Sequence, residues 1–194
     1  MSYTDLHCHS TASDGTDSPS EMARLAKRSG LSAWALTDHD TVAGLEDAAK
    51  VSSELGIDFV TGIEISAEFP YPGTLHLLGY GINPKLESIR EMTGALLEGR
   101  DNRNPKIIKK LQELNVAITM EEVEKEAGKD GNPKAVVGRP HIAAILVRKG
   151  YVSSIKEAFN KYLAQGGLAF FDKERLTPRR AIELIIESGG IAVL

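Results

Sequence analysis

Residues 5–15 read DLHCHSTASDG, a histidine-bearing stretch that passes directly into a polar loop. Tyr3–Cys8 is predicted to be a short strand, and it begins a pattern of strand, polar loop and helix that the following residues repeat. In a strand, residues i and i+2 point to the same side, so His7 and His9 project together while Cys8 faces the other way. The stretch therefore predicts a histidine pair at the carboxyl end of the first strand.

The segments that follow continue the alternation of strands and helices. Ser18, Pro19 and Glu21 form a capping box that predicts the start of the first helix, which ends at Gly30. Further elements are predicted as a strand at Ala33–Thr37, a helix capped by Thr41 and ending at Gly56, and strands at Ile57–Ile63 and Leu75–Ile82. Strands separated by helices pair in parallel through right-handed crossovers, so we predict a parallel sheet covered on both faces.

The chain changes character after residue 83. Residues 84–167 show no strand pattern, and we predict a helical insertion with helices at Pro105–Leu114, Met120–Ala127, Pro140–Lys149 and Ser154–Leu163, and a polar loop at 128–134. Alternation returns in residues 168–194, with a strand at Leu168–Phe171, a helix at Pro178–Ser188 and a strand at Ile191–Leu194. The predicted organisation is therefore a first α/β part at 1–83, a helical insertion at 84–167, and a return to the α/β pattern at 168–194.

The composition is ordinary for a soluble globular protein, with 42% hydrophobic and 26% charged residues among 194. The net charge of −4 gives no general attraction for nucleic acid, so nucleic-acid chemistry would need a local site. The single cysteine excludes an internal disulfide and suits a reducing compartment. We find no apolar run of the signal-peptide or membrane-spanning kind, and we expect a cytoplasmic location, no membrane and no stable protein partner.

Polar side chains gather at the ends of the predicted strands. They are His7, His9 and Asp14 after the first strand, Asp38, His39 and Asp40 after the second, Glu64 after the third, and His76 in the fourth. The carboxyl ends of parallel strands share one rim, where active sites lie. His76 fits this scheme less well, because it lies near the start of its strand.

Histidine nitrogens combined with carboxylate oxygens suit zinc, manganese or iron(II). The ligands exceed what one four-coordinate ion needs, so we predict two or three ions with Glu64 as a bridge. Such clusters produce a metal-bound hydroxide and clamp both oxygens of an in-line displacement, which is the chemistry of phosphoester hydrolysis. Each signal alone also fits a structural role, such as a solvated histidine pair or a capping turn at Asp40 or Thr41. Their coincidence favours metal.

Four motifs carry a resemblance to a known family: DLHCHSTASDG, ALTDHDTVAG, GIEIS and LHLLGYGI, in this order. Together they resemble the PHP (polymerase and histidinol phosphatase) family of metal-dependent phosphoesterases. The pattern is similar to the branch that removes the 3′-phosphate from 3′,5′-bisphosphorylated nucleosides and trims short 5′-phosphorylated RNA from its 5′ end. The resemblance implies an α/β fold, a distorted (β/α)₇ TIM-like barrel with a helical insertion, incomplete in this chain.

The resemblance also implies a catalytic and metal-ligating set at six positions: His7, His9, Asp14, His39, Glu64 and His76. Within it, the first-strand pair binds one ion and Glu64 bridges to a second, which His76 also binds. Asp14 and His39 belong to a third position, where Asp40 orients His39 without binding metal. Mn²⁺ is the expected ion, with Zn²⁺, Fe²⁺ or Mg²⁺ as alternatives.

The insertion contains VGRPH at 137–141. Pro140 places Arg139 and His141 at a helix N-terminus, where backbone N–H groups favour anions. The planar fork of Arg139 can grip a phosphate, and the resemblance implies that this segment folds over the rim and does so. The alternatives are a surface ion pair for Arg139 and a helix-start role for His141.

We therefore predict a metal-dependent phosphatase or exonuclease that acts on small nucleotides or short RNA. The alternatives are a phosphomonoesterase of the histidinol-phosphatase type, a non-catalytic nucleotide- or metal-binding protein, and an unrelated α/β binding protein. In the family, the strand ending GGIAVL here continues into Ala-His-Pro, and a later Asp-x-His supplies further ligands. Neither lies within residues 1–194, so we expect the chain to be part of a longer protein, with weak or no catalysis on its own.

Overall fold

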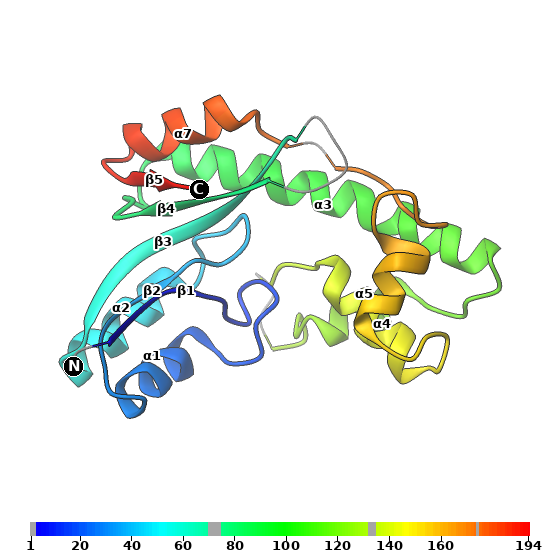
Figure 1. Cartoon of the computed structure of the whole chain (residues 1–194), viewed down its shortest axis with the longest axis horizontal. Coiled ribbons are helices and arrows are strands. Elements are labelled where there is room, and N and C mark those ends of the chain that lie inside the picture. Colours follow the sequence, from blue (N-terminus) through cyan, green and yellow to red (C-terminus); the bar gives the residue numbers. More distant parts are fainter. Residues whose placement is uncertain (1–2, 70–74, 132–134, 174) are drawn as a thin grey trace. The chain divides into compact units, whose positions relative to one another are not determined.

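The chain divides into two units, which are Met1–Leu96 with Arg175–Leu194, and Leu97–Glu174. The computed structural model describes residues 3–69, 75–131, 135–173 and 175–194 (Figure 1). The first unit is built on a five-stranded sheet in which the strands follow chain order: β1 (Tyr3–Cys8), β2 (Leu31–Leu36), β3 (Asp58–Ala67), β4 (Leu75–Tyr80) and β5 (Ile191–Val193). The fold is therefore mixed α/β.

The direction of β4 differs from the prediction. β1, β2 and β3 pair in parallel as predicted, but β4 runs antiparallel to β3, and β5 antiparallel to β4. A parallel crossover needs about a dozen residues or more, and the connection from Ala67 to Leu75 is too short for one. As a consequence Ser66, near the end of β3, lies opposite His76, near the start of β4.

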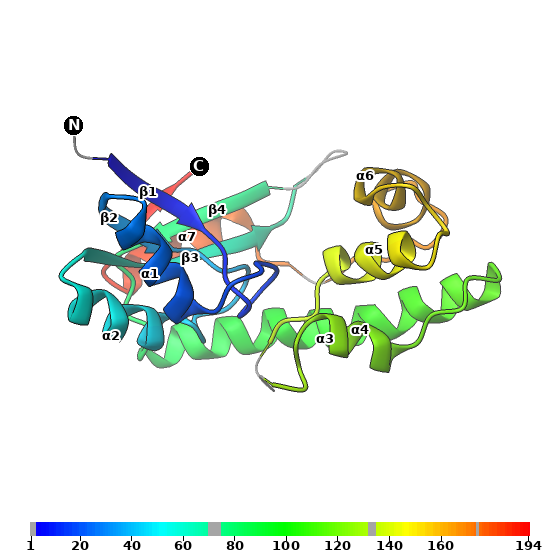
Figure 2. The ribbon, with the colours of Figure 1, turned by 90° about the horizontal axis from the view of Figure 1, so that it is seen from below.

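The helices of the first unit pack against this sheet (Figure 2). α1 (Pro19–Arg28) begins at the predicted capping box, where the Glu21 N–H donates to Ser18 Oγ at 3.2 Å and the Ser18 N–H donates to the Glu21 carboxylate at 3.0 Å. α1 packs on β2 and on α2 (Leu45–Leu55), α2 packs on β3, and α7 (Pro178–Glu187) packs on β3, β4 and β5.

The start of α2 lies later than predicted. Gly44 is its N-cap residue, whereas Thr41 was expected to cap it. The Thr41 hydroxyl instead accepts a hydrogen bond from the Ala43 N–H at 3.2 Å, so it closes a local turn before the helix begins. The C-terminus agrees with the prediction, because Gly56 ends the helix with a left-handed φ of 60°.

One apolar cluster joins the sheet to its helices. Trp34 and Leu36 of β2 face the same side, as do Ile63 and Ile65 of β3, in keeping with the two-residue alternation of strands. The cluster also takes in fully buried residues of the helices, namely Ala23, Ala48, Ile89, Ala181 and Ile185. The predicted cover of both sheet faces is wrong for the outer strands. Residues 3–7 of β1 are all exposed, Tyr3 to 63%, and Ile191 of β5 is 70% exposed.

The second unit is helical. It contains the later part of α3 (Glu87–Glu113), α4 (Met120–Glu126), α5 (Arg139–Arg148), α6 (Ile155–Ala158) and a π-helix (Phe159–Leu163). α3 begins well before the helix predicted at Pro105, and it continues through that proline. Buried residues on both sides of Pro105, such as Leu96 and Ile107, hold the helix together despite the lost backbone hydrogen bond.

The strand predicted at Leu168–Phe171 is wrong. The backbone N–H groups of Leu168 and Ala169 donate to the carbonyls of Lys161 and Tyr162, so this segment wraps around the end of the π-helix. Part of the polar loop predicted at 128–134 lies outside the described residues. The unit boundaries fall within α3 and after residue 174, and the domain boundaries predicted from sequence stay predictions.

Within the part of the chain that the structure describes, no helix combines the length and the apolar character needed to cross a membrane.

Candidate metal centre

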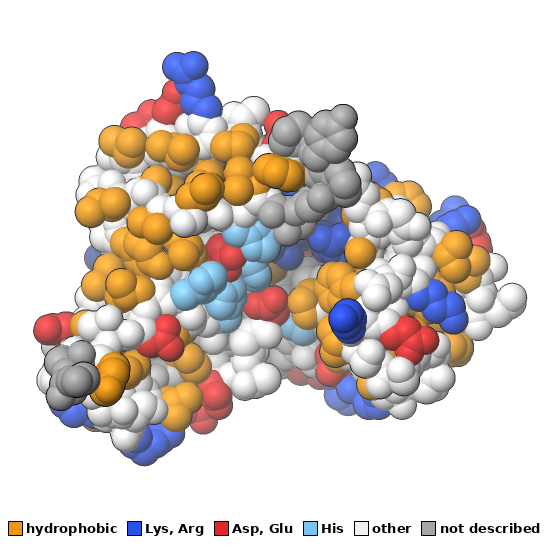
Figure 3. Space-filling model, in the orientation of Figure 1, with side chains coloured by type: hydrophobic (Ala, Val, Ile, Leu, Met, Phe, Trp, Pro, Cys, Tyr) orange, Lys and Arg blue, Asp and Glu red, His pale blue; other side chains and the backbone are white. Residues whose placement is uncertain are grey.

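All six side chains predicted to bind metal lie together in the first unit. β1 and the loop after it bring His7, His9 and Asp14, the segment after β2 brings His39, β3 brings Glu64, and β4 brings His76. In Figure 3 the histidines form a patch at the surface with acidic side chains beside it. The prediction that strand ends gather these residues is therefore confirmed as a matter of geometry, while their chemical role stays a prediction.

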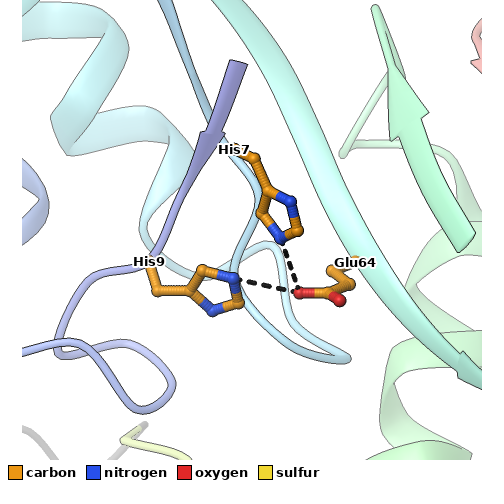
Figure 4. Close-up of side chains that lie close together, drawn as sticks. All are labelled: His7, His9 and Glu64. Atoms are coloured by element: carbon orange, nitrogen blue, oxygen red, sulfur yellow. Dashed lines mark hydrogen bonds and ion pairs between the residues drawn. The ribbon is translucent and has the colours of Figure 1, made fainter. Parts of the chain in front are cut away.

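Glu64 lies at the centre of the group. Its Oε2 is 3.1 Å from His7 Nε2 and 3.0 Å from His9 Nε2 (Figure 4). The same oxygen is 3.4 Å from His39 Nδ1, and Oε1 is 2.7 Å from His76 Nδ1. The Glu64 side chain is only 5% exposed, whereas the His7 side chain is 50% exposed. The group is thus anchored from inside and open to solvent on one side.

The six residues form three overlapping triads. They are His7, His9 and Glu64; His9, Asp14 and His39; and His39, Glu64 and His76. In each triad, one ligand atom from every residue lies within 4.8 Å of the others. The residues shared between triads are His9, His39 and Glu64. Of these, only the two-oxygen carboxylate of Glu64 could serve two ions at once, because a neutral imidazole has one free nitrogen lone pair.

Backbone pairing fixes the central residues. β2 continues past its last residue as an isolated bridge in which His39 pairs with Glu64. The Asp40 N–H donates to the Glu64 carbonyl at 2.9 Å, and the Glu64 N–H donates to the Asp38 carbonyl at 3.2 Å. His76 reaches the same rim because β4 is antiparallel, so that the start of β4 lies beside the end of β3. This explains why His76 did not fit the all-parallel prediction.

Charge coupling within the group perturbs two of its members. Burial alone would raise the pKa of Glu64, but hydrogen bonds from His76, His9 and His7 and the charge of His39 hold it well below its usual range. Burial alone would lower the pKa of His9, but its close contacts with the carboxylates of Asp14 and Glu64 raise it to about 10. Without metal, the protonated imidazole of His9 therefore lies between the carboxylates of Asp14 and Glu64.

The donor atoms fit a divalent metal. Imidazole nitrogens and carboxylate oxygens are ligands that manganese, iron(II) and zinc accept. The Nδ1 atom of His9 is buried and lies 3.1 Å from Asp14 Oδ1. Within the described part of the chain, this nitrogen makes no hydrogen bond of normal geometry, because the oxygen does not lie along the N–H direction. A nitrogen and an oxygen that lie close together without a hydrogen bond between them can both bind the same metal ion, so His9 Nδ1 and Asp14 Oδ1 fit a shared metal position.

The two aspartates beside His39 are buried and hydrogen-bonded to serines that the sequence interpretation overlooked. Asp38 accepts hydrogen bonds from Ser10 and Ser13, and the carboxylate of Asp40 accepts from the backbone and hydroxyl of Ser66. The sequence signal for the serines that bind Asp38 is the group of hydroxyl residues between His9 and Asp14, namely Ser10, Thr11 and Ser13.

Arg139 and His141 lie at the start of α5 in the second unit, as predicted. The Nδ1 atom of His141 accepts a hydrogen bond from the Gly138 N–H at 3.0 Å, so this histidine caps the helix. A neutral His141 consequently carries its ring proton on Nε2, where it can be donated. Arg139 Nη1 donates to the Leu163 carbonyl at 2.8 Å, and its guanidinium lies over the rings of Phe159 and Phe170.

Sequence reasoning also missed a polar group on α3 in the second unit. Arg100 and Arg103 are 8% and 3% exposed, which is unusual for arginine. Arg103 donates through Nε and Nη2 to Asn104 Oδ1, and Asn104 Nδ2 donates to the Val137 carbonyl at 3.0 Å. The signal in the sequence is the pair of arginines three residues apart, which share one helix face.

Comparisons with known proteins agree with the geometry. Residues 5–171 match the PHP domain family. The chain is similar to the 5'-3' exoribonuclease of Haemophilus influenzae, at 38% identity over 98% of this chain and 67% of that protein. It is also similar to the 3',5'-nucleoside bisphosphate phosphatase of Chromobacterium violaceum, at 31% identity over 100% of this chain and 66% of that protein.

A solved structure described as an amidohydrolase from Chromobacterium violaceum, with bound sulfate and no metal, matches the fold with a TM-score of 0.90. It is 31% identical and is aligned over 98% of this chain and 66% of its own length. The chain thus spans about two thirds of the length of the proteins it matches.

Proposed function

Because the chain belongs to the PHP domain family, we propose that the protein is a metal-dependent phosphoesterase that removes phosphate from small nucleotides. The observation that carries the proposal is the set of three linked triads around Glu64. A single structural histidine pair would need no such convergence of side chains from four strands. We further propose that the sheet of the first unit forms part of a distorted (β/α)₇ barrel in the whole protein.

We assign the metal ligands to the six clustered residues. His7, His9 and Glu64 would hold one ion, Glu64 and His76 a second, and Asp14 and His39 a third, with Mn²⁺ as the preferred metal. When bound, such ions supply a nucleophile from water near neutral pH and neutralise charge on the phosphoryl oxygens.

The chain's own contribution is to hold the ligand atoms in place and to leave an open side. The backbone of Glu64 is fixed by its bridge to His39, and the Glu64 carboxylate is held by its contacts with the surrounding histidines. The half-exposed ring of His7 leaves the group accessible to a phosphate. Precise placement of this kind is what lowers the barrier of an in-line displacement.

The substrate class is proposed from the two relatives, whose names refer to an exoribonuclease and to a nucleoside bisphosphate phosphatase. Arg139 and His141 are proposed to hold a phosphate of the substrate, since both can donate hydrogen bonds to an anion at a helix N-terminus. The proposed substrates are therefore a nucleoside with two phosphates or a short RNA with a 5′-phosphate.

The test is the release of phosphate from adenosine 3',5'-bisphosphate by a full-length version of the protein in the presence of Mn²⁺, with short 5′-phosphorylated RNA and histidinol phosphate assayed in parallel. We expect activity on the nucleotide, on the RNA or on both, loss of this activity in chelator, and loss in the Glu64→Gln variant. The Ser18→Ala variant, which alters a helix cap away from the ligands, is the control and should stay active. Activity confined to histidinol phosphate, or activity that survives chelation, would contradict the proposal.

A further inference from the structure

We propose that Asp38 is a positioning residue that holds the loop between His9 and Asp14 in the shape required by the metal position His9–Asp14–His39. The proposal rests on the metal centre of the proposed function and assigns a task to a carboxylate that is not itself in any of the three triads. Asp38 is 2% exposed, so it cannot reach solvent or a substrate directly.

Asp38 receives three hydrogen bonds from the loop. Its Oδ1 accepts from the Ser10 N–H at 2.7 Å and from the Ser13 hydroxyl at 2.6 Å, and its Oδ2 accepts from the Ser10 hydroxyl at 2.6 Å. Ser10 and Ser13 are themselves 0% and 2% exposed. All three bonds are short and buried, as expected for hydrogen bonds to a charged acceptor.

The two serines that bind Asp38 are sequence neighbours of the predicted metal ligands His9 and Asp14. Ser10 directly follows His9 and Ser13 directly precedes Asp14, so the hydrogen bonds to Asp38 hold the loop next to both ligands. The loop is closed further by the Ser13 and Gly15 N–H groups, which donate to the Ser10 carbonyl at 3.0 and 2.9 Å. Asp38 also directly precedes His39. Every ligand of this triad is therefore adjacent in sequence to a member of one hydrogen-bonded network.

A buried carboxylate is costly unless donors surround it, so its presence here needs a compensating set of contacts. Asp38 has these contacts only if the Ser10 and Ser13 side chains both point inward. The adjacent His9 and Asp14 side chains then face each other, with His9 Nδ1 3.1 Å from Asp14 Oδ1. Asp40 offers a contrast, because its carboxylate bonds to Ser66 on β3 and so acts on the strand that carries Glu64. The two aspartates hold different parts of the centre.

The experiment counts Mn²⁺ ions bound per chain, and their affinities, by calorimetric titration and elemental analysis, with thermal unfolding measured in chelator. Asp38→Asn keeps the shape of the side chain and removes its charge, and Ser13→Ala removes one of the three bonds. Ser52→Ala is the matched control, since it deletes a buried hydrogen bond from Trp34 Nε1 at 2.9 Å without touching the loop.

We expect Asp38→Asn to bind one ion fewer, or to bind one ion about 10- to 100-fold more weakly, while the remaining ions bind as before. Ser13→Ala should weaken the binding of the same ion by a smaller factor. If Asp38→Asn does not fold, the result for Ser13→Ala alone tests the positioning role. Ser52→Ala should lower the unfolding temperature without changing ion binding. Unchanged ion number and affinity in both loop variants would overturn the positioning role alone. A wild-type protein that binds no divalent ion would refute the metal centre and the positioning role together.

Discussion

Gly15 is the position where a single methyl group should disturb the centre most directly. A Cβ added to Gly15 would lie 2.3 Å from the His9 carbonyl oxygen, 2.6 Å from the His9 carbonyl carbon and 2.8 Å from Ser10 Cα. These are backbone atoms, which cannot rotate away as the end of a side chain can. Gly15 does not have a positive φ, so the expected effect comes from space and not from backbone conformation.

The size of the effect follows from these distances. Favourable contacts lie at about 3.5 to 4.0 Å, so Gly15→Ala must separate the loop from the His9 backbone by about 1 Å. Overpacking of this kind costs about 1 to 3 kcal/mol. For a chain of this length that corresponds to a drop of about 2 to 12 °C in the unfolding temperature. A ligand misplaced by about 1 Å should reduce phosphoesterase activity by about 100-fold.

The measurement is Mn²⁺-dependent phosphate release together with thermal unfolding, for the wild type, Gly15→Ala and Gly94→Ala, each made in a full-length version of the protein. Gly94 lies in α3 with no atom within 4 Å of an added Cβ, so alanine there should be neutral or stabilise the helix by up to about 1 kcal/mol. A Gly15→Ala protein with wild-type activity and wild-type unfolding temperature would refute the reasoning, because the loop would then have moved without disturbing His9.

Three further predictions concern the centre and a helix cap. Glu64→Gln should lower Mn²⁺ affinity more than about 100-fold, measured by calorimetry, since Glu64 contributes to two of the three triads. Ser18→Ala should lower the free energy of unfolding by about 1 kcal/mol in urea titrations with ion binding unchanged, because it removes the α1 cap. In chelator, the stability from the lowered pKa of Glu64 is present above about pH 4.5 and lost as pH falls, whereas that from the raised pKa of His9 is present below about pH 6.5 and lost as pH rises through about 10. The urea midpoint should therefore be highest between about pH 4.5 and 6.5. If the midpoint of Glu64→Gln falls with pH as steeply as that of the wild type, the pairing of Glu64 with the histidines does not contribute to stability.

Local signals in the sequence were sufficient for the helix starts and for the histidine pair. The capping box at Ser18 and the proline at position 140 each mark a helix that the structure contains. These signals are reliable because the groups that make them lie within one turn of one another. The helix start predicted at Pro105 is wrong because a proline favours a helix start only locally. Buried residues on both sides of Pro105 favour a helix there, and α3 continues through the proline.

The sequence by itself determined which chemistry is available. The spacing of His7 and His9 puts two imidazoles on one side of a strand, and acids follow the next strands. Only the tertiary structure decided how these groups meet. It reverses β4 so that His76 reaches the rim, places Glu64 between four imidazoles, and turns Ser10 and Ser13 onto Asp38. The physical reason is that these contacts join residues 12 to 57 positions apart, and no local preference of the chain specifies pairings over such separations.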